Sequence, residues 1–185
     1  MLNISEVAIS GVLDAAVLRT RNPYLAVAYG SMARRVVNPP TSIISALNRA
    51  YWIQRFGPPH AIISSDAIVE KVEVERPWLL LTAWRLGLDG VVTSVEGAKS
   101  VVEHRMYMKN PLARASIVVP RPRGVKTVFA TARNAVGVVA DLLAYLELQY
   151  ARVTLGDYGE RWYVIDVDPV PPLDREEALL LAELL

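Results

Sequence analysis

The chain has no cysteine and only two histidines, and these absences exclude several classes of site. Without cysteine there is no disulfide framework, no thiolate-based zinc site and no thiol nucleophile. The two histidines, His60 and His104, are too few for a histidine-rich metal centre. The sequence therefore predicts neither a metal ion nor another cofactor.

Long apolar runs are also missing, although 52% of the 185 residues are hydrophobic. No segment reaches the roughly 18 uninterrupted apolar residues that a membrane span requires, because Arg, Asp or Gly interrupts each run. The first residues lack a basic flank followed by an apolar stretch, so no signal peptide is predicted. We expect a cytoplasmic protein without membrane contact, with enough apolar residues for one domain or two small ones.

An excess of charge of one sign is also missing. The chain has 20 Lys and Arg residues and 19 Asp and Glu residues, which gives a net charge of +1. This balance gives no overall attraction to nucleic acid. Only four of the basic residues are lysine, so arginine dominates. Arginine favours bidentate pairing with carboxylate or phosphate, although a GC-rich genome would produce the same bias.

Prolines, glycines and other turn residues divide the chain into predicted helices and strands. An apolar stripe between Pro40 and Gly57 predicts a helix over 42–56, and Asp174 is expected to cap a helical tail. Alternating apolar and charged residues predict a strand over 68–75. The other expected elements are a helix over 77–87, a strand or helix over 127–138, and strands over 61–64, 90–93, 101–108, 115–119, 141–147, 152–155 and 161–167.

These elements predict a fold of the α+β or mixed α/β class. We expect a small N-terminal α/β domain over residues 1–75, a mixed-sheet domain over 76–172 and a short helical tail over 173–185. The boundary is placed at Arg76–Pro77, because proline is well tolerated in the first turn of a helix.

Two groups of residues are candidates for chemistry on their own pattern. His104 is a conceivable general base, with Tyr107 as its partner in a stand-alone enzyme, but a histidine beside methionines is more often packed as structure. Gly30–Ser31 is similar to the loop of nucleotidyltransferases, but the two carboxylates that such a site needs do not follow it. We therefore interpret Gly30 as part of a turn.

A third group is basic, and a fourth is acidic. The loop over 120–126, which is stiffened by two prolines, predicts either a phosphate-contacting patch or a solvated surface loop. The loop contains Arg121, Arg123 and Lys126, and Arg114 shortly before it belongs to the same basic patch. Asp157 and Glu160 lie on a turn between two predicted strands.

Four short motifs follow one another in the second half of the chain: 78–92, Tyr107 with 116–119, 132–145 and 156–165. In this order they resemble the C-terminal nuclease-like domain of archaeal tRNA-splicing endonucleases. The resemblance implies RNA cleavage by a Tyr, a His and a Lys. Tyr107 matches the first, but the other two positions fall on Ala113 and Ala140.

The resemblance therefore implies a non-catalytic, structural subunit of a two-plus-two heterotetramer. Its partners would be a catalytic endonuclease subunit and precursor tRNA, and the chain alone would be inactive. Asp157, Glu160, Trp162 and Tyr163 would form the subunit interface. The basic patch would bind RNA, and an independent RNA-binding or assembly module remains the alternative.

Overall fold

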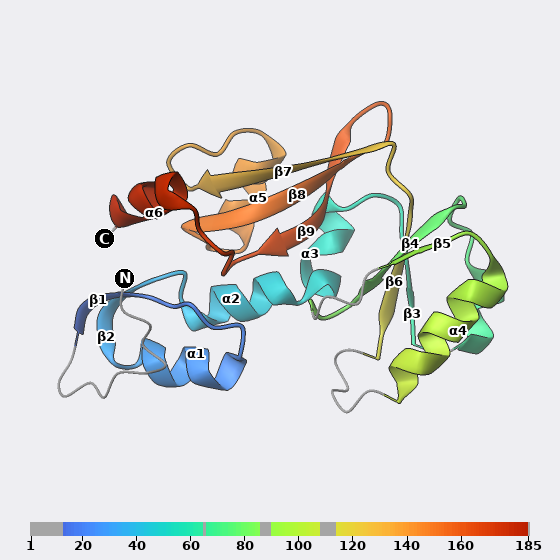
Figure 1. Ribbon diagram of the computed structural model, residues 1–185, viewed down its shortest axis with the longest axis horizontal. Coiled ribbons are helices and arrows are strands. Elements are labelled where there is room, and N and C mark those ends of the chain that lie inside the picture. Colours follow the sequence, from blue (N-terminus) through green and yellow to red (C-terminus); the bar gives the residue numbers. More distant parts are fainter. Residues whose placement is uncertain (1–12, 65, 86–89, 108–113, 185) are drawn as a thin grey trace. The chain divides into compact units, whose positions relative to one another are not determined.

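The computed structural model describes residues 13–64, 66–85, 90–107 and 114–184 (Figure 1). The described residues form three sheets with helices between their strands, which is a mixed α/β arrangement as predicted. Among these residues, no helix combines the length and the apolar character needed to cross a bilayer.

The chain forms two compact units, and each unit is assembled from segments that are distant in the sequence. The first unit comprises residues 1–47, 127–154 and 167–185, and the second comprises residues 48–126 and 155–166. The predicted division into domains at residue 76 stays a prediction, and Arg76 itself lies inside the second unit.

The first unit begins with a parallel pair of strands, β1 (Leu13–Val17) and β2 (Ala33–Val37), joined by helix α1 (Pro23–Gly30). Helix α2 (Pro40–Leu47) follows. Gly30 is required where α1 ends, because a Cβ there would lie 2.8 Å from the ring of Pro40. The unit also contains α5 (Val138–Tyr145) and α6 (Arg175–Ala182).

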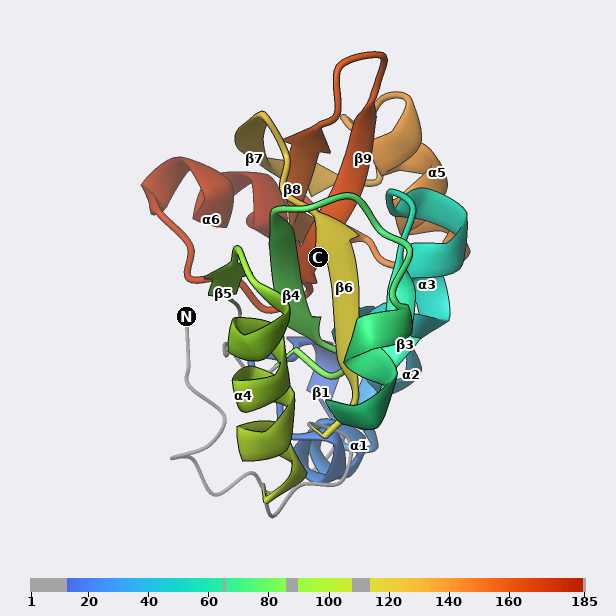
Figure 2. The ribbon, with the colours of Figure 1, turned by 90° about the vertical axis from the view of Figure 1, so that its right-hand side faces the viewer.

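The second unit is built on a four-stranded sheet in the order β3-β6-β4-β5 (Figure 2). Its strands are β3 (Ala61–Ile63), β4 (Trp78–Thr82), β5 (Gly90–Val92) and β6 (Ser116–Pro120). All three pairings in this sheet are antiparallel. Its helices are α3 (Arg49–Phe56), the 3₁₀ helix η2 (Asp66–Lys71) and α4 (Val95–Met106).

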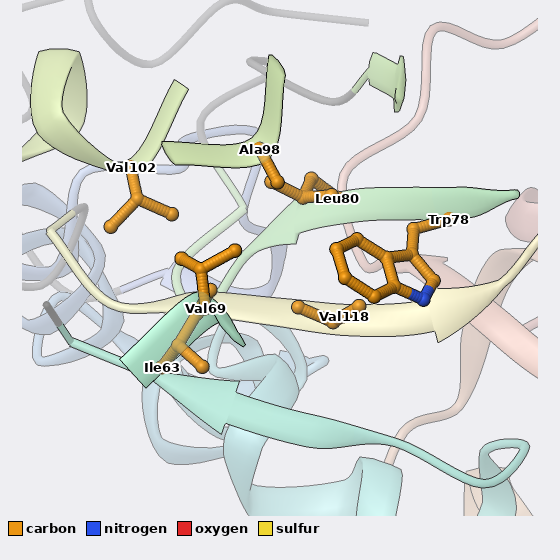
Figure 3. Packing of buried hydrophobic residues seen from close by; sticks show 7 residues of the cluster. All are labelled: Ile63, Val69, Trp78, Leu80, Ala98, Val102 and Val118. Carbon is orange, nitrogen blue, oxygen red and sulfur yellow. The ribbon is translucent and has the colours of Figure 1, made fainter. Parts of the chain in front are cut away.

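The core of this unit lies where η2 and α4 meet one face of the sheet (Figure 3). Val69 of η2 and Ala98 and Val102 of α4 pack against the strand residues, and all are buried. The strand residues of this cluster are Ile63, Trp78, Leu80 and Val118. This packing holds the edge strand β3 and the chain that follows it in place.

A third sheet has the order β7-β8-β9, with strands β7 (Gly124–Thr131), β8 (Tyr150–Asp157) and β9 (Trp162–Asp168). Of the stretch predicted as a strand or a helix over 127–138, residues 127–131 are strand and the rest is turn or loop up to the start of α5. Strand β9 confirms the strand predicted over 161–167, and β8 includes the one predicted over 152–155. Helix α6 confirms the predicted tail, with Asp174 and Glu177 forming a capping box.

The prediction of one helix over 42–56 is confirmed only in part, because Asn48 interrupts it. Asn48 forms an isolated β-bridge with Trp84, so the chain makes two helices, α2 and α3. The predicted strands at 61–64, 90–93 and 115–119 correspond to β3, β5 and β6.

Four other predicted elements are wrong. The helix predicted over 77–87 is strand β4, because an all-apolar central strand carries no period that separates it from a helix. The strand predicted over 68–75 is η2 followed by an irregular segment that bends at Val74. The strands predicted over 101–108 and 141–147 are helices α4 and α5. In α4, the buried residues Ala98, Val102 and Arg105 share one helical face.

Candidate functional site

An ion-pair cluster in the second unit joins α3 and β9 around one carboxylate. Arg49 donates to Asp166 Oδ1 from Nη2 at 2.9 Å and from Nε at 3.3 Å. Arg85 Nε donates to both oxygens of Asp166 at 2.9 Å. The Asp166 carboxylate is therefore shared by two guanidinium groups.

The three side chains differ in their access to solvent. The Arg49 side chain is 2% exposed, whereas those of Arg85 and Asp166 are each 20% exposed. Water can therefore reach the Arg85 side of the cluster but not Arg49. A small anion that reaches the cluster would meet a guanidinium group that is already oriented.

Backbone pairing explains the position of Arg49. Its N–H donates to Ala83 O at 2.8 Å, next to the bridge between Asn48 and Trp84. Its guanidinium also donates to the carbonyl oxygen of Thr82 at 3.0 Å and to the Thr82 hydroxyl at 3.2 Å. The end of β4 therefore fixes the start of α3 and the charged group together.

The first unit contains a separate polar network at the end of β9. Asp168 accepts from Arg21 Nη2 at 2.5 Å and from the Val170 N–H at 3.1 Å, and its side chain is 7% exposed. The buried Asn38 side chain bonds the backbone of Tyr150 and of Pro169. This carboxylate is therefore engaged within its own unit.

Tyr150 belongs to the same network and is fully buried. Burial raises the pKa of Tyr150, because the phenolate would lose its hydration, and nearby Arg19 opposes this effect. Tyr150 therefore stays protonated at neutral pH and does not act as a base there.

The predicted interface residues lie on the β8–β9 hairpin. Asp157 Oδ1 accepts from the Gly159 N–H at 2.8 Å, so this carboxylate helps to form its own turn. The ring of Tyr163 contacts that of Tyr158 edge-on at 5.6 Å. Glu160 and Trp162 are exposed. Nothing in the structure tests an interface role for this hairpin, which stays a prediction.

The predicted basic patch is exposed, and part of it contacts the same hairpin. Arg114, Arg121, Arg123 and Lys126 all lie on the surface. The Arg123 N–H donates to Asp157 O at 2.8 Å. Its guanidinium lies beside Gly159, where a Cβ would be 3.0 Å from Arg123 Nη1. This arginine therefore packs against its own turn.

The residues of the stand-alone enzyme alternative are also exposed. His104 and Tyr107 lie at the end of α4, and Tyr107 is 81% exposed. The interpretation of His104 as a packed strand residue is therefore wrong. Ala140 lies in α5, and Ala113 lies outside the described residues.

Four residues of these networks were not predicted from the sequence: Arg49, Arg85, Asp166 and Asp168. One signal was available: Asp166 and Asp168 are charged residues within an otherwise apolar strand. Charged side chains at such positions are almost always paired. The partners could not be inferred, because Arg49 is 117 residues from Asp166 in the sequence.

Comparison with known proteins gives a different fold from the one expected. No family model matches the chain, and no curated protein matches it. The ATP-grasp RimK domain protein from Sphaerobacter thermophilus matches 97% of this chain and 82% of its own, at 14% identity and a TM-score of 0.66. The chain therefore has the ATP-grasp fold.

Other ATP-grasp enzymes match in the same way. D-alanine–D-alanine ligase from Helicobacter pylori matches 89% of this chain and 68% of its own, at 11% identity and a TM-score of 0.62. The ligase PsnB, in a structure with a precursor variant, Mg and ADP, matches 88% of this chain and 64% of its own, at 8% identity and a TM-score of 0.63. At these identities the likeness shows the fold alone.

The ATP-grasp fold overturns the endonuclease interpretation. The prediction of a structural tRNA-splicing subunit with a catalytic partner and precursor tRNA is wrong, and nothing supports its alternatives. The expected RNA-binding role of the basic patch loses its basis with it. The motifs behind the resemblance are short and mostly apolar, and many α/β folds contain such strands and turns.

The fold raises the question of magnesium, which the PsnB structure holds with ADP. Magnesium is bound through carboxylates and phosphates. Over the part of the chain that the structure describes, no group of three His, Asp or Glu side chains could hold a metal ion. The carboxylates of Asp166 and Asp168 are bonded to arginines. These two carboxylates of β9 therefore do not fit a magnesium ion.

Proposed function

We propose that this chain binds a nucleotide without magnesium, with the Arg49–Asp166–Arg85 cluster attracting its phosphates. The ATP-grasp fold, matched over 97% of the chain, carries the proposal, because structures with this fold hold ADP or AMPPNP. The two arginines of the cluster supply positively charged groups that attract phosphate. Arginine suits phosphate because its planar group donates two parallel hydrogen bonds.

The role of each group follows from its exposure. Arg49 is buried and bonded to Thr82 and Asp166, so it positions the cluster without needing to touch the ligand. Arg85 is partly exposed and supplies the group that meets an anion. Asp166 holds both guanidinium groups in place, so the arginine side chains lose little conformational entropy when the nucleotide binds.

We expect isothermal titration of the whole chain with ATP to give the same affinity in EDTA and in magnesium. Arg85→Ala should weaken ATP binding about 10- to 100-fold, which is the range for hydrogen bonds to a charged group. Arg121→Ala removes an exposed arginine of the same unit and serves as the matched control. Melting curves show whether each variant remains folded. If Arg85→Ala and Arg121→Ala bind ATP with equal affinity, the cluster does not bind its phosphates.

A magnesium-dependent ligase is the second candidate, because the similar structures include several ligases. It predicts the opposite metal dependence: ATP binding that requires magnesium and ADP release with an amino acid or peptide acceptor. The same titration, followed by an ADP assay in magnesium, separates the two functions. ADP formation that depends on magnesium would overturn the metal-free proposal.

A further inference from the structure

An open groove of about 500 Å³ lies beside the edge of the four-stranded sheet, within the second unit. Strand β3 and the residues just before it line the groove, together with the segment 71–75, which runs from the last residue of η2, and with Pro120 at the end of β6. Its polar lining residues are His60, Lys71, Glu73 and Glu75. This groove is separate from the arginine cluster, with which it shares no residue.

Both β3 and the segment 71–75 offer unpaired backbone. β3 pairs only with β6 in the described part of the chain, and in an antiparallel pair alternate residues direct their N–H and C=O groups to the outer side. Residues 73–75 make no backbone–backbone hydrogen bond to any described residue. Such an edge is a template for an added strand.

The segment 71–75 already has the pattern of a half-buried strand. Val72 and Val74 are half-buried and pack against the core of Figure 3, whereas Glu73 and Glu75 are exposed. The Trp78 indole N–H donates to Val74 O at 2.8 Å, which holds the segment against β4. This bond and the two half-buried valines anchor the segment, although it bends at Val74 and is not itself a strand.

The polar groups of the groove are mostly hydrogen-bond acceptors. Glu73 and Glu75 are carboxylates, and Lys71 offsets only one of these two charges. His60 Nδ1 lies 3.0 Å from Pro58 O. A carbonyl oxygen can only accept, so Nδ1 donates and Nε2 of the neutral ring is left as an acceptor. A ligand for this lining must bring donors and positive charge.

We propose that the groove binds an extended peptide segment with lysine or arginine at alternate positions. Its backbone would pair with the outer side of β3, and its basic side chains would meet Glu73 and Glu75. Ile62, which lines the groove and is 42% exposed, provides an apolar contact. β3 has only three residues, so the pairing is short and the charges decide which peptide binds.

The test is titration of the ¹⁵N-labelled chain with the capped peptide Val-Lys-Val-Lys-Val, followed by NMR. We expect shifts in the amides of 61–63 and 73–75 and in the Trp78 indole. The double variant Glu73→Gln/Glu75→Gln should bind at least about fivefold more weakly, since two charge contacts are lost. Glu96→Gln/Glu103→Gln removes two exposed carboxylates of α4 and is the matched control.

Two further peptides separate backbone pairing from simple charge attraction. Val-Glu-Val-Glu-Val should not shift the groove residues, and the lysine peptide N-methylated at alternate amides should lose its binding. Equal binding by the Gln double variant, equal binding by the methylated peptide, or shifts confined to other surfaces would each overturn the proposal. Concentration-dependent self-association through the same amides, seen by sedimentation, would instead assign the edge to a second copy of the chain and also overturn it.

Discussion

Asn38→Ala is expected to lower the free energy of unfolding by about 3–5 kcal/mol, because it leaves several buried backbone groups without a hydrogen-bond partner. Asn38 Oδ1 accepts from the N–H groups of Gln149 (2.8 Å) and Tyr150 (3.3 Å). Its Nδ2 donates to Tyr150 O at 2.8 Å and Pro169 O at 3.1 Å. One side chain thus links the end of β2 to β8 and to the chain after β9 inside the first unit.

The backbone of Asn38 adds a second constraint, since its φ is +55°, in the left-handed region that asparagine tolerates better than alanine. Asn38→Gly separates the two effects, because glycine adopts this φ freely and makes no side-chain bonds. Chemical denaturation should show the glycine variant still destabilised by most of the alanine effect. Wild-type stability of the glycine variant would mean that the hydrogen bonds contribute little.

Asp166→Ala is expected to destabilise the chain by a similar amount, about 3–5 kcal/mol, because it leaves Arg49 buried without its carboxylate. Arg49 is 2% exposed and cannot regain hydration without unfolding its surroundings. In a chain of this size such a loss lowers the melting temperature by roughly 6–20 °C. Calorimetry of the two proteins measures the difference directly.

Asp14→Ala is the matched control, because its carboxylate is 94% exposed and lies 3.6 Å from Arg34. An exposed pair of this kind contributes about 0–1 kcal/mol, so the control should melt close to wild type. The double variant Arg49→Met/Asp166→Leu should recover part of the loss, since the buried Arg49 charge is removed and Arg85, which is 20% exposed, keeps contact with water. A single Asp166→Ala variant that melts like Asp14→Ala would contradict the buried ion pair.

Short elements with clear end signals were predictable from the sequence alone. The cap at Asp174 and the prolines and glycine around 42–56 act on neighbouring residues, so local chemistry determines where these helices begin and end. Strands β3, β5, β6 and β9 also follow from local apolar patterns. These interactions span a few residues, and their partners are visible in the printed sequence.

Where the sequence offered only a run of apolar residues, contacts with other parts of the chain determined whether a helix or a strand formed. The stretch 78–82 is compatible with a helix or a strand, and it becomes β4 because β5 and β6 pair with both of its edges. Asn48 likewise interrupts an otherwise continuous helical pattern because Trp84 provides a bridge partner. Propensity is a weak prior that such contacts override.

The absence of thiol chemistry, the balance of charge and the mixed α/β class could all be predicted in advance, because they depend only on composition and local pattern. The ATP-grasp fold and the candidate site could not, because they depend on long-range contacts. Arg49 and Asp166 are 117 residues apart, and no local rule pairs them. Their pairing depends on which strand packs beside which helix, and that choice is made by the burial of the whole chain.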